Sequence, residues 1–168
     1  MIKKYNENDM DSVLEIWLTA SIRAHDFISA EFWESQVENM RNIYIPASEV
    51  YVYEMDSKVV GFYALYESRL AAIFVAPELQ GKGIGKQLLN HAKSQRTILT
   101  LSVYKENQAS YQFYLSQGFN VVSEQLDEHT GYPEYTMSTG TFNKRLKRDC
   151  QRVAFPVPMS RGGCSCCV

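Results

Sequence analysis

The amino-acid sequence predicts a mixed α/β fold built as one domain. Segments with helical spacing of apolar residues alternate with short runs rich in β-branched and aromatic residues. The chain has 168 residues, 45% of them hydrophobic and 12% aromatic, which is enough for one sizeable core. No repeat and no linker interrupts its first part. We therefore expect one domain over residues 1–142 and an extension over residues 143–168.

The first half of the domain is expected to form two helices and three strands. Apolar residues recur at helical spacing after Asn8 and Asp9, so a helix is predicted over residues 8–20. Ser29 predicts the start of a second helix, which Pro46 should stop. The β-rich segments that follow are 49–55, 59–67 and 70–75.

The second half alternates helices and strands. The expected elements are a helix over 83–93, a strand over 97–104, a helix over 107–117, and strands over 119–126 and 135–141. Gly118 is a good helix stop, because glycine adopts the left-handed conformation found there. The predicted order is ααβββαβαββ.

Charge is divided unevenly between domain and extension. Residues 1–142 contain 11 Lys and Arg and 18 Asp and Glu, which gives a net charge of −7. Residues 143–168 contain six Lys and Arg and one Asp, which gives a net charge of +5. An acidic domain argues against nucleic acid as the main partner and favours cationic ligands. No apolar run approaches the roughly 18 residues of a membrane helix, and no secretory signal is recognised. We expect a cytoplasmic monomer or homodimer with no membrane partner.

All the cysteines fall in the extension: Cys150, Cys164, Cys166 and Cys167. The domain itself therefore offers no disulfide and no cysteine nucleophile. No histidine lies near the cysteines, so no metal site is predicted. We expect residues 143–168 to form a flexible basic extension outside the fold.

The most informative segment connects the strand 70–75 to the helix 83–93. It reads Phe74-Val75-Ala76-Pro77-Glu78-Leu79-Gln80-Gly81-Lys82-Gly83-Ile84-Gly85-Lys86. Glycines allow a phosphate to approach the backbone closely, and the N–H groups and dipole at a helix start attract the anion. Lys82 and Lys86 add positive charge at the rim. The segment therefore predicts a phosphate-bearing ligand.

Two common phosphate loops do not fit this segment. A Walker loop needs four residues between its first Gly and the Gly-Lys pair, whereas three separate Gly81 from Gly85, and Gln87 replaces the Ser or Thr. The dinucleotide fingerprint needs a third glycine where Lys86 stands. Both are excluded by spacing.

The spacing of Gln80, Gly83 and Gly85 fits Gln-x-x-Gly-x-Gly, and here the chain resembles the GNAT superfamily of N-acetyltransferases. A second motif, over residues 107–119, resembles the family signature that joins an Asn at a helix start to Phe-Tyr and Gly-Phe. The resemblance covers roughly residues 1–141. It implies a central twisted, largely antiparallel sheet that splays open near Phe74 and Val75 to admit acetyl-CoA.

The resemblance also implies roles for individual residues. The glycine loop would bind the pyrophosphate, Asn107 the pantetheine, and the backbone N–H groups near Phe74 and Val75 the oxyanion. Tyr114 would lie near the thioester sulfur and act as general acid. The implied cofactor-binding residues are Phe74, Val75, Gln80, Gly81, Lys82, Gly83, Ile84, Gly85, Lys86 and Asn107.

The expected reaction is transfer of acetyl from acetyl-CoA to a primary amine by direct attack in a ternary complex, with no metal. The amine must first lose a proton, because a free lysine has a pKa near 10.4. The sequence leaves the base open: the candidates are Glu67, His25 on the acceptor side, Tyr104 and Glu134.

Three questions about function stay open at this level. The acceptor is a protein lysine, a protein N-terminus or a small amine. The donor is acetyl-CoA or a longer acyl-CoA. The alternative to an enzyme is a catalytically silent module that binds or senses acyl-CoA, although retention of Tyr114 and of the complete loop favours the enzyme.

Overall fold

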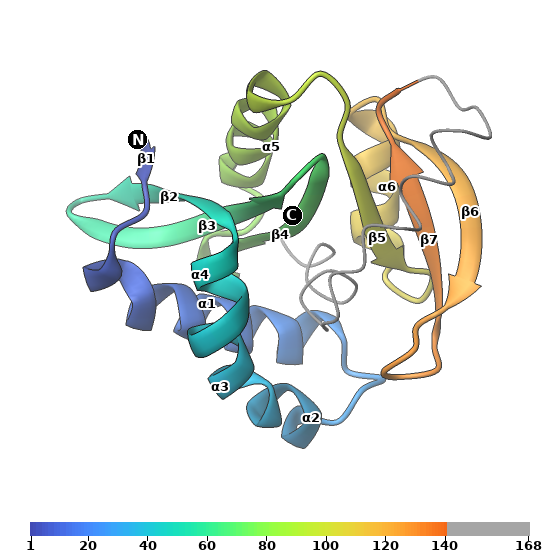
Figure 1. Cartoon of the computed structure of the whole chain (residues 1–168), viewed down its shortest axis with the longest axis horizontal. Coiled ribbons are helices and arrows are strands. Elements are labelled where there is room, and N and C mark those ends of the chain that lie inside the picture. The colour runs from blue at the N-terminus through green and yellow to red at the C-terminus, as the bar shows by residue number, and fades with distance from the viewer. Residues whose placement is uncertain (141–168) are drawn as a thin grey trace.

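The computed structural model describes residues 1–140, and its helices and strands alternate as predicted (Figure 1). The strands are β1 (Ile2–Lys4), β2 (Glu49–Met55), β3 (Lys58–Tyr66), β4 (Arg69–Val75), β5 (Thr100–Tyr104), β6 (Asn120–Leu126) and β7 (Pro133–Ser138). The helices are α1 (Met10–Ala24), α2 (Ala30–Ser35), α3 (Val37–Asn39), α4 (Ile45–Ala47), α5 (Ile84–Gln95) and α6 (Gln108–Ser116). Short 3₁₀ turns, η1 (Glu7–Asp9) and η3 (Pro77–Leu79), precede α1 and follow β4, and a π-helical turn, η2 (Met40–Tyr44), precedes α4.

The strands form one seven-stranded sheet in the order β1-β2-β3-β4-β5-β7-β6. Every neighbouring pair is antiparallel except β4 and β5, which are parallel and joined only at Arg69 and Thr100. The two strands then diverge toward their C-terminal ends (Figure 1). The largely antiparallel sheet is confirmed, and Phe74 and Val75 lie on the β4 side of this opening.

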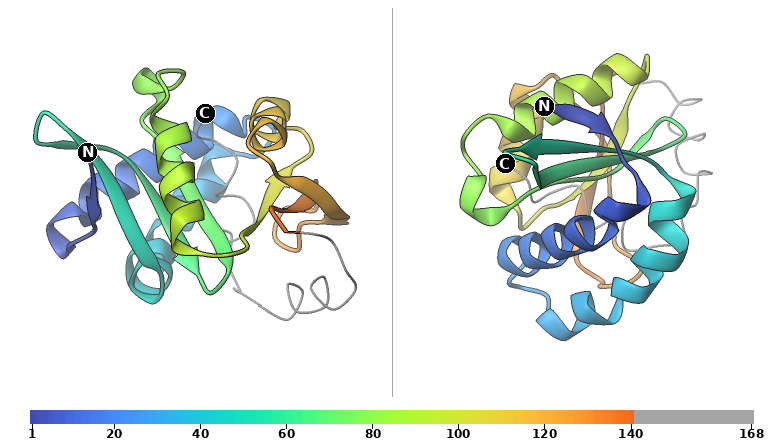
Figure 2. Two further views of the ribbon diagram at one scale, coloured as in Figure 1. Left: turned by 90° about the horizontal axis from the view of Figure 1, so that it is seen from above. Right: turned by 90° about the vertical axis from the view of Figure 1, so that its left-hand side faces the viewer.

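Helices cover both faces of the first half of the sheet (Figure 2). Helix α1 packs against β3 and β4 on one face, and α5 packs against the same strands on the other. Strand β4 is buried along its whole length, which explains its unbroken apolar sequence Leu-Ala-Ala-Ile-Phe-Val. Helix α6 lies against β5 in the second half. The opening between β4 and β5 is therefore framed by rigid, packed elements.

The region after Ser29 differs from the predicted single helix. The Ser29 hydroxyl accepts a hydrogen bond from the Phe32 N–H, as expected of a cap. The helical path then runs through α2 and, after Gln36, continuously through α3, η2 and α4, and it ends at Ala47, one residue past Pro46. Proline is tolerated in the first turn of a helix, where its missing N–H would have no intrahelical partner. Pro46 occupies that position in α4, and the chain leaves the helix at Ser48.

Two features at the N-terminus were not predicted. Strand β1 pairs antiparallel with β2, but three residues are too few to show a periodic pattern. Asn6 caps the 3₁₀ turn η1: its side chain accepts from the Asn8 N–H, and its own N–H donates to the Asp9 carboxylate at 3.1 Å. Asp9 is the N-cap residue of α1, without a side-chain hydrogen bond to that helix. Helix α1 also continues to Ala24, one turn beyond the predicted end.

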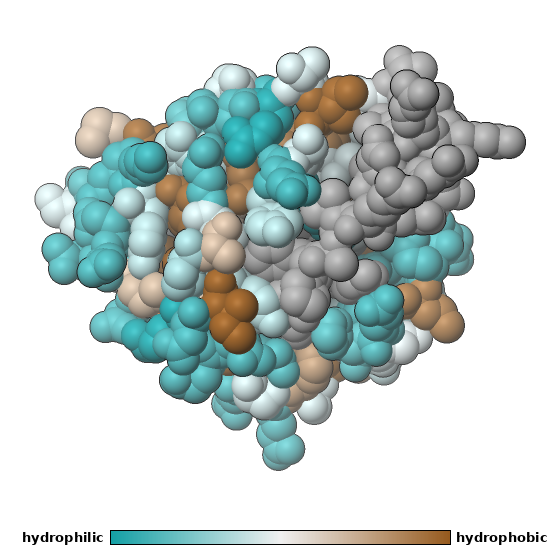
Figure 3. All heavy atoms as spheres, viewed as in Figure 1, coloured by the Kyte–Doolittle hydropathy of each residue, from teal (hydrophilic) through white to brown (hydrophobic). Residues whose placement is uncertain are grey.

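The surface in the view of Figure 3 is mainly hydrophilic, with small separate apolar patches. Over residues 1–140, no helix is long and apolar enough to cross a membrane. The same residues contain no cluster of His, Cys, Asp or Glu that could hold a metal ion. The predicted domain end at residue 142 and the predicted flexible extension, with its four cysteines, lie outside the described residues and stay predictions.

Candidate active site

The loop after β4 forms a backbone cradle at the start of α5. Gly81 and Gly83 have φ angles of +81° and +86°, a conformation that side chains rarely adopt. Gly83 is the N-cap residue of α5 and provides no side-chain cap for the first N–H groups. A Cβ added at either glycine would meet no atom within 4 Å, so the space over the backbone is open. These features fit a bound pyrophosphate, with the exposed Lys82 and Lys86 beside it.

Gln80 ties this loop to the end of β4. Its Nε2 donates a hydrogen bond of 3.1 Å to the carbonyl oxygen of Val75. On the other edge of the strand end, the Ala76 N–H donates to the Val60 carbonyl at 2.8 Å. The strand end that faces the opening is thus held by its own loop, which fixes the backbone near Phe74 and Val75.

We expect Gly83→Val to weaken acetyl-CoA binding by more than tenfold, about 1.4 kcal/mol, because its side chain would occupy the space over the cradle. The positive φ should also cost about 1–2 kcal/mol of unfolding free energy. Gly131→Val is the matched control, since Gly131 has a φ of +77° and equally open surroundings in the β6–β7 loop. Calorimetry should show normal affinity for the control; unchanged affinity in a folded Gly83→Val protein would contradict the assignment.

Asn107 and Tyr114 lie on the other side of the opening. Asn107 is the N-cap of α6, and its Oδ1 accepts from the Ser110 N–H at 3.3 Å. Its Nδ2 lies 3.5 Å from Nε2 of His25. Tyr114 is fully buried, and its ring packs 5.5 Å from Phe113 and 5.7 Å from Phe119. Both residues therefore have structural contacts beside the roles that the resemblance implies.

A polar and aromatic wall stands beside the opening on the face opposite α6. Tyr104 and Glu134 are direct cross-strand partners on β5 and β7. The Tyr104 hydroxyl donates a hydrogen bond to Asp127, which also accepts from the Thr130 hydroxyl at 3.1 Å. We call this cluster the acceptor wall; its residues are His25, Phe27, Tyr104, Asp127, Thr130, Tyr132 and Glu134. His25, Tyr104, Asp127 and Glu134 are buried, and the other three are partly exposed.

The acceptor wall joins two loops that are far apart in the sequence. The Tyr132 hydroxyl donates to the Phe27 carbonyl at 2.8 Å, linking the β6–β7 loop to the α1–α2 loop. The ring of Phe27 lies 5.5 Å from that of Tyr104 and 5.0 Å from that of Tyr132. Phe27, Asp127 and Tyr132 were missed from the sequence, because only the fold brings them to Tyr104.

His25 lies at the centre of these aromatic contacts and is fully buried. Its ring centroid is 5.1 Å from Tyr104, 5.2 Å from Trp33 and 5.8 Å from Phe27. Burial lowers its pKa from 6.5 to about 3, so the ring is neutral near pH 7. The acceptor-side role expected of His25 stays a prediction; a buried neutral ring is suited to holding Asn107 and Tyr104 and not to gripping an acceptor.

The lowered pKa of His25 makes stability depend on pH. The unfolded chain binds a proton at this residue below pH 6.5, whereas the folded chain binds it only near pH 3, so stability present above pH 6.5 is lost as pH falls. From pH 7 to pH 5 we expect His25 to account for about 2 kcal/mol of lost unfolding free energy. Urea unfolding at the two pH values should show a loss of unfolding free energy that is about 2 kcal/mol smaller for His25→Gln than for wild type. An equal loss in wild type and variant would contradict it.

Glu67 lies far from the opening between β4 and β5, where a base for the acceptor amine would be needed. It occupies the β3–β4 turn with a φ of +54°, and its side chain is exposed. Its carbonyl oxygen accepts from Arg96 Nε at 2.7 Å. The turn adjoins Arg69, where β4 and β5 still pair, at the opposite end of β4 from Val75 and about 20 Å away along the strand. We therefore do not retain Glu67 as the base.

Comparison with known proteins agrees with this geometry. A family model described as an acetyltransferase (GNAT) domain matches residues 46–121. The peptidyl-lysine N-acetyltransferase YiaC of Escherichia coli is 35% identical over 139 residues, which are 82% of this chain and 95% of the relative. The peptidyl-lysine N-acetyltransferase YjaB of the same organism is 28% identical over 133 residues, 79% of this chain and 90% of the relative.

Solved structures show the same fold. The apo form of E. coli YjaB aligns with a TM-score of 0.74 and 26% identity, over 84% of this chain and 98% of that one. PaiA N-acetyltransferase from Thermoplasma acidophilum was solved in complex with coenzyme A. It aligns with a TM-score of 0.70 and 20% identity, over 84% of this chain and 98% of that one. Given the glycine cradle, the parted strands and these likenesses, the chain belongs to the GNAT family and is an N-acetyltransferase that transfers acetyl from acetyl-CoA to a primary amine.

Proposed function

We propose that the acceptor is the side-chain amine of a lysine in a protein, so that the chain is a peptidyl-lysine N-acetyltransferase. The relatives YiaC and YjaB carry that activity in their names, and the match spans 95% and 90% of their own lengths. The domain's net charge of −7 suits a cationic acceptor. The acceptor wall contributes two further carboxyl groups, Asp127 and Glu134, both buried. We further propose that it works in the cytoplasm as a monomer or homodimer.

The base is proposed to be Glu134. Tyr104 is unsuited, because burial and the Asp127 carboxylate raise its pKa far above 10 and its hydroxyl already donates to Asp127. Asp127 is held by Tyr104, by the Thr130 hydroxyl and by the His129 N–H. His25, with a pKa of about 3, is too weak a base. Glu134 lies opposite Tyr104 on β7, with Gln125 Nε2 donating to its Oε1 at 3.2 Å.

The remaining steps follow from the frame around the opening. Glu134 takes a proton from the lysine ammonium, directly or through water, and the neutral amine attacks the thioester carbonyl. Backbone N–H groups near Phe74 and Val75 stabilise the oxyanion that forms. The attacking nitrogen then loses its second proton to water, and the C–S bond breaks as the tetrahedral intermediate collapses. Tyr114 donates its hydroxyl proton to the CoA thiolate and regains a proton through water. The cradle of Gly81 and Gly83 holds the pyrophosphate throughout.

The observation that carries the proposal is the acidic, aromatic acceptor wall beside the parted strands. The test is a panel of acceptors given with acetyl-CoA: an N-terminally blocked lysine peptide, a lysine-free peptide with a free N-terminus, a polyamine and an aminoglycoside. The release of free thiol should be fastest with the blocked lysine peptide. A polyamine or the free N-terminus as the preferred acceptor would contradict the proposal.

A further inference from the structure

A groove lies on the α1 face of the sheet, separate from the glycine cradle and the acceptor wall. It encloses about 510 Å³ between α1, the β2–β3 turn and the segment after β4. Its floor is mostly apolar; the apolar lining residues are Ile16, Met55, Val59, Val60, Ala76, Pro77 and Leu79. We call it the α1 groove. A groove of this size with an apolar floor can hold side chains of a bound peptide.

The rim of the α1 groove is acidic. Glu15, Asp56 and Glu78 line it with exposed carboxylates, against the single cation Lys58. Within residues 1–140, no ion pair neutralises these three acids.

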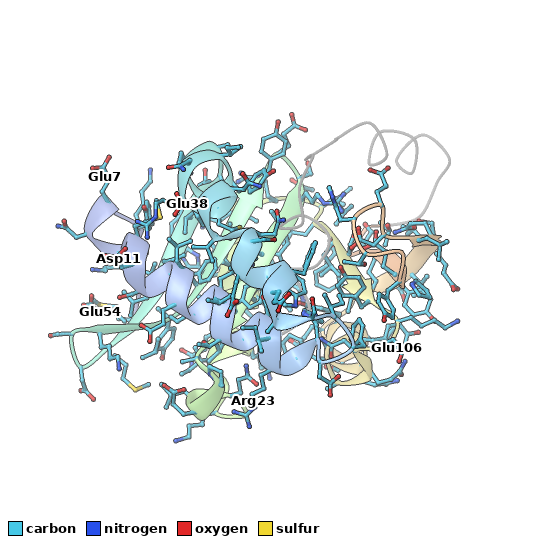
Figure 4. The ribbon with its side chains drawn as sticks, turned by 90° about the horizontal axis from the view of Figure 1, so that it is seen from below. Glu7, Asp11, Arg23, Glu38, Glu54 and Glu106 are labelled. Atoms are coloured by element: carbon cyan, nitrogen blue, oxygen red, sulfur yellow. The ribbon has the colours of Figure 1, made fainter. Side chains whose placement is uncertain are left out.

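Acids around the groove are paired, in contrast to those of the rim. Glu54 lies 2.8 Å from Lys3 and Asp11 lies 3.2 Å from Arg41. Figure 4 shows Asp11 and Glu54 at the N-terminal end of α1 and on the neighbouring hairpin. The three rim carboxylates thus stand unpaired next to paired neighbours, and a cationic segment would complement them.

We propose that the α1 groove binds a basic segment of the acceptor protein, close in sequence to the lysine that is acetylated; this rests on the peptidyl-lysine function proposed above. The groove adjoins the site through Ala76, which follows Val75, and through α1, which ends next to His25. Along the helix, Thr19 and Glu15 lie about 9 and 15 Å from His25. An extended peptide covers that distance in about three to five residues. The preferred basic residue therefore stands three to five positions from the acceptor lysine.

Two other ligands of the α1 groove have to be considered: acetyl-CoA, which its charge disfavours, and the chain's own extension, which an experiment tests. The phosphates of acetyl-CoA would be repelled by three carboxylates, so the groove is unsuited to that ligand. The chain's own residues 143–168, with a net charge of +5, are the competing basic segment. Full-length protein in which Lys144, Arg145, Lys147 and Arg148 are replaced by glutamine should bind a basic peptide no more tightly than wild type. Tighter binding would assign the groove to the chain's own extension and overturn the proposal.

The activity test uses single-lysine peptides that differ only in one arginine, placed four positions from the lysine, placed eight positions away, or absent. We expect kcat/KM to be about fivefold higher with the arginine at four positions, at low salt. Glu15→Gln with Asp56→Asn should abolish this preference and leave acetylation of the neutral peptide unchanged. Glu38→Gln with Glu124→Gln removes the same charge from other surfaces and should keep it.

A binding test separates this proposal from the proposed function. A fluorescent arginine-containing peptide without lysine should bind the wild type about fivefold more tightly than Glu15→Gln with Asp56→Asn, measured by anisotropy. If that difference appears while no lysine peptide is acetylated, the peptidyl-lysine function is wrong and the groove still binds basic segments. Equal binding to wild type, groove variant and control variant would overturn the groove proposal.

Discussion

Replacing Tyr114 by phenylalanine should lower the turnover number by about 10²–10⁴, while acetyl-CoA still binds. The change removes the proposed proton donor for the CoA thiolate and keeps the ring that packs on Phe113 and Phe119. The turnover number is measured on the best acceptor of the panel, and acetyl-CoA affinity by calorimetry. Loss of rate with normal affinity assigns Tyr114 to the chemical step.

Tyr111→Phe is the matched control for this experiment. Tyr111 lies on the same helix, α6, half-buried, with its ring 5.0 Å from that of Tyr135. Removal of its hydroxyl should leave turnover within about twofold of wild type, because that hydroxyl has no part in the proposed mechanism. Equal turnover in Tyr114→Phe and Tyr111→Phe would reduce Tyr114 to a packing residue.

Replacing Glu134 by glutamine should lower kcat/KM by at least about 100-fold at neutral pH, because the lysine ammonium then lacks its proton acceptor. The amide can still accept the hydrogen bond from Gln125, so the fold should be retained. The deficit should shrink as pH rises toward about 10.4, where lysine loses its proton without help. A pH profile of kcat/KM for wild type and variant measures this.

The control for Glu134 is Glu124→Gln, which removes an exposed carboxylate from the neighbouring strand β6. Within residues 1–140, Glu124 pairs with Lys105 alone, at the surface, so kcat/KM should change little. A Glu134→Gln deficit that stays constant at every pH would point to a structural defect. A rate within about threefold of wild type would remove Glu134 from the mechanism.

Much of the fold could be predicted because local signals agree with the final packing. The apolar strand 70–75 is buried on both faces, and Ser29 and Gly118 cap helices as expected. The sequence-based predictions were inaccurate where a residue's effect depends on its position within the folded element. Pro46 was expected to stop a helix, and the helical path runs one residue past it, to Ala47, since proline is tolerated in the first turn of α4.

The candidate site divides in the same way. The glycine cradle and the helix start at Asn107 are contiguous in sequence, so their motifs could be recognised. The acceptor wall has no motif, because Phe27, Tyr104 and Asp127 come from separate segments and meet only through the sheet order β5-β7-β6. Glu67 was a candidate because it lies at the end of a strand. The sequence does not show that β4 and β5 still pair at that end and separate only toward Val75.

The central claim is that this chain moves acetyl directly from acetyl-CoA to a lysine side chain. The most direct measurement is mass spectrometry of an N-terminally blocked single-lysine peptide after incubation with acetyl-CoA and the full-length protein, with free thiol quantified in the same sample. We predict one acetyl group on the lysine Nζ for each CoA thiol released. Tight binding of acetyl-CoA with neither acetyl-lysine nor thiol formed would contradict the claim and identify the protein as an acyl-CoA sensor.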